Sequence, residues 1–285
     1  MTERATEIVL RRSKIKRVCQ RGGLLAHSKV RGFTLIEVAM AMAVIGVLLA
    51  GTLGPLAMQV EQRRRYASEQ MLKEALDALL GYAVVHGVLP CADGAAQSDG
   101  WADWAGDGQS DASGCKTYPS VGWLPHRSLG VAGLDGWGNR LGYAVSADFT
   151  RPHARGEPCG GDDFDLCATS EVAIEDWDPL QGVRDEETAF GVAAVIVGYG
   201  KNAREMQLFA GGPTHAQAPA GDYLHEPENA DGDLVFVSRR ASMGARACTD
   251  SRDAGSLPRC HFDDLLVWIS PAILMERMVS SRRLP

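Results

Sequence analysis

The sequence predicts an α+β protein in which a long N-terminal helix packs on a small antiparallel sheet with disulfide-closed loops. We expect the helix to have a membrane-spanning half and an amphipathic half. The run from Phe33 to Val60 contains a single charged residue, Glu37, and helical spacing of apolar residues resumes after it. Short apolar or alternating segments between turn residues follow, as is typical of strands. With 285 residues and 45% hydrophobic content, the chain can bury one substantial core.

Charge is divided unevenly along the chain. Residues 1–32 carry nine Lys and Arg against two Glu, a net of +7. Because the whole chain has a net charge of −7, residues 33–285 carry −14. Such an acidic body lacks the basic face that nucleic-acid binding requires, so no nucleic-acid partner is expected. The pattern favours a basic cytoplasmic segment, an apolar span and an acidic exported domain.

The apolar run is long enough to cross the inner membrane once. Because about 20 residues cross about 30 Å of hydrocarbon, we expect a transmembrane helix over 33–56 with its N-terminus in the cytoplasm. Gly51, Gly54 and Pro55 weaken helices, so a bend or a melted turn is expected there. The alternative is a cleaved secretory signal peptide, whose apolar region would be shorter and followed by a polar break.

Residues 57–87 are predicted to continue the helix with one apolar stripe on a periplasmic globular domain over 88–285. The stripe consists of residues at helical spacing: Met71, Leu72, Ala75, Leu76, Leu79, Leu80, Ala83 and Val84. The helix should end near His86, because Gly87 follows it and Pro90 comes soon after.

Four segments of the globular domain have strand patterns bounded by turn residues. They are Leu141–Ser146, Gly191–Gly200, Asp233–Arg239 and Asp263–Ser270. The last two are expected to form a hairpin, and all four to pack on the lower half of the helix. After them, Ser270 can cap a short helix that starts with Pro271.

The stretch "RGFTLIEV", Arg31 to Val38, places a glycine before the apolar run and a glutamate five positions into it. With the long apolar helix that follows, this motif resembles the class III leader of type IV pilins and type II secretion pseudopilins. The resemblance implies that a prepilin peptidase removes residues 1–32 by cutting after Gly32, and that Phe33 becomes an N-methylphenylalanine. Glu37 would be the motif's glutamate. A leader of this length is more typical of a minor pilin or minor pseudopilin than of a major one.

Glu37 raises a physical question, because a lone charge in hydrocarbon is costly. In a bundle of such helices its carboxylate can pair with the Phe33 amine of a neighbouring subunit, and a paired charge costs less. This predicts an assembly role for Glu37. The alternative is that Glu37 reaches the cytoplasmic lipid headgroups.

Cysteine usage is consistent with an exported domain. There are seven cysteines, and removal of residues 1–32 would take away Cys19 and leave six. Six cysteines allow fifteen pairings, but spacing groups them as Cys91 with Cys115, Cys159 with Cys167, and Cys248 with Cys260. Disulfides are therefore predicted, each worth about 2–4 kcal/mol. A zinc site is the alternative, but no pair has C-x2-C spacing, and His153 and His261 stand alone.

The stretch "DGWGNRLGYAV", Asp135 to Val145, resembles the "DPWG" turn of pseudopilins. Gly136, Gly138 and Asn139 tolerate positive φ, so the segment predicts a tight turn with Trp137 packed beneath it. We expect this role to be structural.

One acidic, glycine-rich loop is a weak calcium candidate, because calcium prefers oxygen ligands on flexible backbone. Its aspartates are Asp99, Asp103, Asp107 and Asp111. The loop lacks EF-hand spacing, so a solvated loop closed by a disulfide is the favoured interpretation. A similar stretch around Asp162 and Asp163 has an even weaker pattern, and no other metal or cofactor is expected.

No catalytic residues are predicted, because the common nucleophile, phosphate-binding, zinc-protease and dinucleotide motifs do not occur. Asp263 and Asp264 adjoin a predicted strand, where neighbours face opposite sides, so they are not expected to form an acid/base dyad. Two function classes remain. The first is a structural subunit of a type IV pilus or type II secretion-like fibre, which assembles with other pilin or pseudopilin subunits through its N-terminal helix. The second is a membrane- or fibre-anchored binding or adhesin module that acts through its large disulfide-bonded loops.

Overall fold

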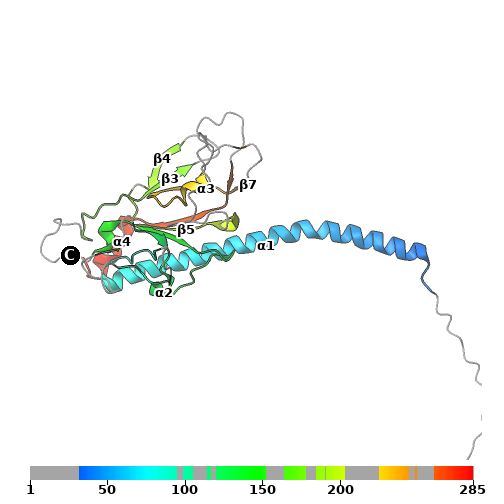
Figure 1. Ribbon diagram of the computed structural model, residues 1–285, viewed down its shortest axis with the longest axis horizontal. Coiled ribbons are helices and arrows are strands. Elements are labelled where there is room, and N and C mark those ends of the chain that lie inside the picture. The colour runs from blue at the N-terminus through cyan, green and yellow to red at the C-terminus, as the bar shows by residue number, and fades with distance from the viewer. Residues whose placement is uncertain are drawn as a thin grey trace, which may run out of the picture. The chain divides into compact units, whose positions relative to one another are not determined.

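The structure is a computed structural model (Figure 1). It describes residues 32–94, 99–104, 114–116, 120–151, 164–177, 184–189, 191–202, 225–243, 248 and 260–284. The chain divides into two compact units, Met1–Leu53 and Gly54–Pro285. Several residues named above lie outside the described part, namely residues 1–31, Asp107, Asp111, His153, Cys159, Asp162 and Asp163.

Helix α1 (Leu35–His86) is the longest element of the chain. It ends where the sequence predicts, and Gly87 follows with a φ of 84°, a left-handed conformation that glycine adopts easily. The melted turn expected at Gly51, Gly54 and Pro55 is wrong, since the described helix runs through all three. A proline removes only one hydrogen bond from the ladder, and the long helix on either side retains the rest. Among the helices that the structure describes, none combines the length and apolar character required to cross a membrane.

Arg283 closes the C-terminal end of α1. Its Nε donates a hydrogen bond to the carbonyl of Val84 at 2.7 Å, and its Nη2 donates to the carbonyl of Val85. The last carbonyls of a helix lack partners within the helix, so a cation there is favourable. The next residue, Leu284, is buried in the core that α1 shares with the main sheet.

In the part of the chain that the structure describes, the main sheet has four strands, each antiparallel to its neighbours. In spatial order they are β1 (Ser120–Trp123), β2 (Gly142–Val145), β5 (Ala194–Gly198) and β9 (Leu265–Ile269). The apolar stripe of α1 packs on this sheet, as the cyan part of α1 shows in Figure 1. The shared core includes Leu72, Ala75, Leu79 and Ala83 from the helix and Tyr143, Val145, Ile196 and Ile269 from the strands. The predicted α+β packing of the amphipathic helix on an antiparallel sheet is confirmed.

A second sheet holds β4 (Arg184–Ala189), β3 (Ala173–Trp177) and β6 (Val235–Arg239), in that order. β6 runs parallel to β3, and Ile174 and Phe236 are buried together in a separate core. The expected hairpin of 233–239 with 263–270 is therefore wrong. The pattern identifies both strands, but burial against distant residues decides which strand each one joins.

In chain order, a pair of short antiparallel strands comes between β6 and β9. Its strands are β7 (Ser242–Met243) and β8 (His261–Phe262). The remaining short elements are the helices α2 (His126–Leu129), α3 (His225–Glu228) and α4 (Pro271–Ser280) and the 3-10 segments η2 (Ala147–Thr150) and η3 (Gly200–Asn202). α4 starts at Pro271 as predicted. Ser270 occupies the N-cap position but makes no capping hydrogen bond with its side chain, so the expected cap is wrong.

Candidate functional site

The first turn of α1 is closed by reciprocal hydrogen bonds between Thr34 and Glu37. Glu37 Oε2 accepts from the Thr34 backbone N–H at 2.9 Å and from the Thr34 hydroxyl at 3.0 Å. In return, the Glu37 backbone N–H donates to Thr34 Oγ1 at 3.3 Å. This arrangement is a capping box, which satisfies backbone N–H groups that a helix start leaves unpaired. Glu37 therefore has a role within its own chain, in addition to any role between chains.

The two residues before this cap, Gly32 and Phe33, have free space around them. A Cβ on Gly32 would meet nothing within 4 Å, and Phe33 is 84% exposed. The fold of this chain thus sets no limit on the size of a side chain at position 32. A requirement for glycine there would come from a processing enzyme. Large apolar side chains along the following helix are exposed as well, including Leu35, Ile36, Met40, Met42 and Val47.

Thr34 is a capping residue that the leader motif alone does not identify. Its signal is the spacing T-x-x-E from Thr34 to Glu37 ahead of an apolar run, which is the sequence signature of a capping box. The capping box lies directly after Gly32 and Phe33, so the cap and the predicted cleavage position occupy one short segment. Cleavage after Gly32 would leave both capping residues in the mature chain.

A tight turn fixes the globular domain to α1. Ser68 Oγ accepts a hydrogen bond from the Gly136 N–H at 2.8 Å and donates to the carbonyl of Arg64 at 3.1 Å. A Cβ on Gly136 would lie 2.1 Å from the Arg64 carbonyl oxygen, so the turn can approach the helix only with glycine at this position. The "DGWG" segment therefore contacts the helix backbone directly.

Asp135 organises this turn. Its Oδ1 accepts hydrogen bonds from the backbone N–H groups of Trp137 at 2.9 Å and Asn139 at 2.8 Å. Of the positions expected to tolerate positive φ, Gly138 adopts it, at 86°. Burial raises the pKa of Asp135 because the charged form loses water, and hydrogen bonds from Asn139 and Trp137 oppose this effect.

Disulfides close two of the predicted loops. Cys91 is bonded to Cys115 with a Cα–Cα distance of 5.4 Å, and Cys248 to Cys260 with 4.9 Å. Cys167 is also disulfide-bonded. Its predicted partner, Cys159, lies outside the described residues.

In the described part of the calcium candidate loop, the aspartate side chains accept hydrogen bonds from backbone N–H groups of the same loop. Asp99 Oδ1 accepts from the Trp101 N–H at 3.0 Å, and Asp103 Oδ2 accepts from the Gly94 N–H at 2.8 Å. Neither aspartate belongs to a group of potential metal ligands among the described residues. Asp99 thus forms a local turn, whereas Asp103 links two parts of the loop that are nine residues apart.

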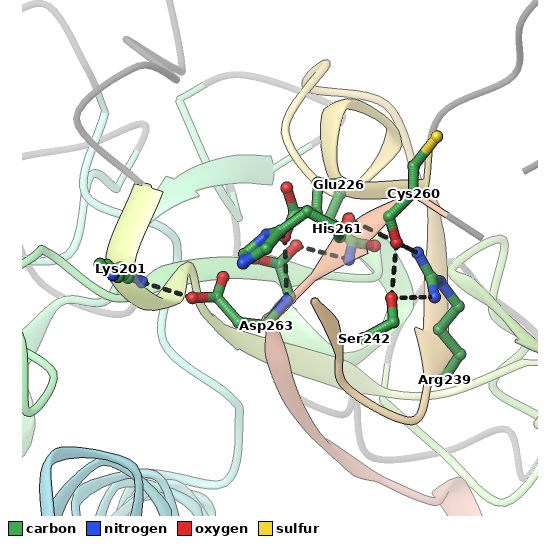
Figure 2. A network of polar contacts seen from close by, with 9 residues as sticks. Lys201, Glu226, Arg239, Ser242, Cys260, His261 and Asp263 are labelled. Atoms are coloured by element: carbon green, nitrogen blue, oxygen red, sulfur yellow. Dashed lines mark hydrogen bonds and ion pairs between the residues drawn. The ribbon is translucent and has the colours of Figure 1, made fainter. Parts of the chain in front are cut away.

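A polar group that the sequence did not predict lies where α3 meets β8 (Figure 2). Glu226 Oε1, from α3, accepts a hydrogen bond from the Asp263 N–H at 2.9 Å and lies 3.0 Å from His261 Nδ1. Asp263 Oδ2 accepts from the Lys201 N–H at 2.8 Å. One ligand atom from each of Glu226, His261 and Asp263 lies within 4.8 Å of the others. His261, which stands alone in the sequence, is thus joined by a carboxylate 35 residues away, a distance that no local motif reports.

Asp264 is buried beside this group, with 3% of its surface exposed. Its Oδ2 accepts a hydrogen bond from Asn229 Nδ2 at 2.8 Å. Burial raises the pKa of Asp264 well above its ordinary value, and the charge of Glu226 raises it further. Among the described residues, neither Asp263 Oδ1 nor Asp264 Oδ1 has a hydrogen-bond partner, although both atoms are buried.

Near the group of Glu226, His261 and Asp263, Arg239 at the end of β6 forms a hydrogen bond to the residue before β8. Arg239 Nη2 donates to the carbonyl of Cys260 at 3.0 Å, and Ser242 Oγ donates to the same carbonyl. The guanidinium also lies over the ring of Phe262, 4.4 Å from its centroid. The backbone that carries His261 and Asp263 is therefore held by hydrogen bonds, and Figure 2 shows the two sets of contacts side by side.

Comparison with known proteins gave one match. Residues 27–53 match the family model described as the prokaryotic N-terminal methylation motif. This stretch contains Gly32, Phe33 and both residues of the capping box. The comparison with curated proteins found no match. The comparison with solved structures found none either.

Proposed function

We propose that this chain, which carries the N-terminal methylation motif of the type IV pilin and pseudopilin family, is a minor pilin or minor pseudopilin. In this role it is a structural subunit of a type IV pilus or of a type II secretion-like fibre. Its partners are other pilin or pseudopilin subunits and a prepilin peptidase. The observation that carries the proposal is the methylation motif directly followed by a capped helix with an exposed apolar surface.

Before assembly, the proposed location is the inner membrane. The basic segment before Gly32 would remain in the cytoplasm, the apolar half of α1 would contact lipid, and the acidic domain would lie in the periplasm. Cleavage after Gly32 and methylation of the Phe33 amine would then release the subunit for incorporation into the fibre. This order is consistent with the charge division of the sequence, in which the basic residues come first.

In the fibre, Glu37 would pair with the Phe33 amine of a neighbouring subunit. The capping box engages Oε2 of Glu37 in both hydrogen bonds from Thr34. This arrangement fixes the rotamer of the carboxylate and directs it toward the N-terminal end of the helix. A carboxylate held in place loses less conformational entropy when it binds a cation than a mobile one does. The cap and the intermolecular ion pair are therefore compatible.

A substitution at Gly32 tests the processing step. We expect the wild-type protein, extracted from membranes, to begin at N-methylated Phe33 in mass spectrometry, and Gly32→Val to retain the leader and stay out of sheared fibres. Gly46→Val is the matched control, because a Cβ at Gly46 also meets nothing within 4 Å in this chain. The control should be processed normally. A wild-type chain that keeps Met1, or is cut near Ala50, would contradict the proposal.

Deletion of the gene for this protein can show whether the subunit belongs to a pilus or to a secretion system. Loss of the protein should reduce either the number of fibres seen by electron microscopy or the secretion of substrates across the outer membrane. A complementing copy with Gly32→Val should fail to restore the phenotype, whereas one with Gly46→Val should restore it. Normal fibres and normal secretion without the protein would instead favour an anchored binding module.

A further inference from the structure

We propose that Glu226, His261 and Asp263 form a binding site for a divalent transition-metal cation of the zinc class. The site lies in the globular domain and does not depend on the proposed role in a fibre. Its three side chains come from α3, from β8 and from the residue after β8. Figure 2 shows the three residues close together, with the Asp263 carboxylate directed toward Lys201.

The donor set fits this class of ion. One imidazole nitrogen and two carboxylate oxygens lie within 4.8 Å of one another, close enough for one ion to contact all three after small side-chain movements. An imidazole ligand favours zinc and similar ions over calcium and magnesium, which prefer oxygen ligands. Three protein ligands would leave a fourth position for water or for a donor from a partner.

The ligands are positioned before any ion binds. The Asp263 N–H fixes Glu226 Oε1 at 2.9 Å, and the Lys201 N–H fixes Asp263 Oδ2 at 2.8 Å. Gly200 has a φ of 63°, and a Cβ there would lie 2.3 Å from Asp263 Oδ1. Glycine at this position thus makes room for the Asp263 carboxylate. Backbone groups that orient ligands in this way commonly tune metal affinity.

Two buried carboxylate oxygens, one in the proposed site and one beside it, provide an independent indication that this region can take a cation. Asp263 Oδ1 and Asp264 Oδ1 are buried and have no hydrogen-bond partner among the described residues. Asp264 itself is 3% exposed; burial and the charges of Glu226 and Asp263 raise its pKa, whereas the Asn229 hydrogen bond and the Arg239 charge lower it. Buried polar atoms without partners are rare in native proteins, because they lose their hydrogen bonds to water. A cation bound between Glu226 and Asp263 would give Asp263 Oδ1 a partner.

The competing interpretation is an ion pair between protonated His261 and Glu226 with no metal. The contact of 3.0 Å between Nδ1 and Oε1 is compatible with both states. They differ in their response to zinc, because a protonated imidazole does not bind a metal and must release its proton first.

The test uses the purified full chain with its disulfides intact, stripped of metal with a chelator and titrated with Zn²⁺ by calorimetry. We expect one equivalent to bind and the melting temperature to rise. His261→Gln and Asp263→Asn should each weaken binding at least tenfold, whereas His86→Gln, which removes an exposed imidazole at the end of α1, should not. In Asp263→Asn the side-chain oxygen can still accept from the Lys201 N–H, so this variant should fold. Equal melting temperatures of the metal-free proteins would verify that both ligand variants are folded.

Cobalt provides a second readout. Co²⁺ in the wild-type site should give visible absorption bands that include an imidazole contribution, and these bands should change in His261→Gln. Absence of stoichiometric Zn²⁺ binding by the wild type would overturn the proposal and leave the ion pair. Equal binding by the wild type and both ligand variants would also overturn it, since the metal would then be held elsewhere.

Discussion

Ser68 and Gly136, 68 residues apart in the chain, are joined by a hydrogen bond of 2.8 Å between the Ser68 hydroxyl and the Gly136 N–H. Because Ser68 also bonds to the carbonyl of Arg64, one hydroxyl connects the helix backbone with the turn at Asp135. Ser68 is completely buried, so water does not compete for either bond. The position of the main sheet against α1 thus depends on the close approach of two backbones.

Gly136→Ala should destabilise the globular domain by about 1–3 kcal/mol, because the new methyl group would overlap the Arg64 carbonyl. Chemical unfolding of the purified protein measures this effect. Gly81→Ala is the matched control, since a Cβ there meets nothing within 4 Å and alanine favours the helix by about 0.5–1 kcal/mol. The two substitutions should therefore have opposite signs. Equal stability of Gly136→Ala and wild type would show that the turn does not need this contact.

Substitutions at Thr34 and Glu37 distinguish the contribution of the helix cap to fibre assembly from that of the Glu37 charge. Glu37→Gln keeps an acceptor for the Thr34 donors but removes the charge. Thr34→Val removes both hydrogen bonds of the Thr34 hydroxyl and keeps the charge. If the proposed pairing with the Phe33 amine drives assembly, Glu37→Gln and Glu37→Ala should both lower incorporation into sheared fibres. Thr34→Val should have a smaller effect, in line with the roughly 1 kcal/mol of an N-cap. Thr34→Ser should behave as wild type, because serine caps as well as threonine does.

A wild-type level of Glu37→Gln in fibres would indicate that the carboxylate serves the cap alone. Membrane insertion of each variant is the control, and it should be unchanged or improved when the charge is removed. Labelling of fibre tips must accompany the assay, since a subunit at the tip has fewer neighbours to pair with. Folding of the globular domain should be the same in all four variants.

The pH dependence of stability should change when Asp135 is replaced. Its pKa in the folded state is raised from 3.8, so the folded state binds more protons than the unfolded state between these two pKa values. Stability therefore falls as the pH rises through that interval. Asp135→Asn keeps the acceptor for Trp137 and Asn139 and does not ionise, so we expect it to be more stable than wild type at neutral pH.

Below about pH 3.8 this difference between Asp135→Asn and wild type should disappear, as thermal unfolding over a pH series would show. Asp135→Ala is the comparison variant. It leaves buried N–H groups without an acceptor, and should lose about 1–3 kcal/mol at every pH. A constant difference between Asp135→Asn and wild type from pH 3 to pH 7 would contradict the role of ionisation.

Removal of a disulfide should destabilise the domain, and the effect should be larger for the disulfide that closes the longer loop. Cys91 and Cys115 are separated by 24 positions and Cys248 and Cys260 by 12. Doubling the length of a loop adds about 0.6 kcal/mol of closure entropy, so the double Cys→Ser variant of the first pair should lose more stability. Peptide mapping without reductant should also find Cys159 bonded to Cys167. A free thiol at Cys159 would contradict that pairing.

Much of the fold follows from local pattern. The stripe from Leu72 to Ala83 is the face of α1 that packs on the sheet, and the end of the helix at His86 follows from Gly87. The strand near Val267 also lies where alternation places it. These features depend on residues close in sequence, which is the range over which propensity and periodicity act.

Features that depend on distant residues were not predictable in this way. β6 has a strand pattern that fits several partners, and its place beside β3 depends on burial of Phe236 in a separate core. The group around His261 likewise forms only because α3 and β8 are in contact. Their contact cannot be predicted from residue spacing, since His261 and Glu226 are 35 residues apart. The capping box differs from both, because its sequence signature is local. It consists of the spacing between Thr34 and Glu37, which also lies within the leader motif.

The hydrogen bonds from Arg283 to Val84 and Val85 join positions 199 and 198 residues apart. In the proposed export, the helix end would therefore emerge long before the side chain that closes it. Until residue 283 had crossed, the last carbonyls of α1 would be solvated and Leu284 would be missing from the core, so the domain would complete its folding only after nearly all of it had been translocated. A tag fused close to Arg283 would act at this final step, and reporter fusions would be better placed in a loop.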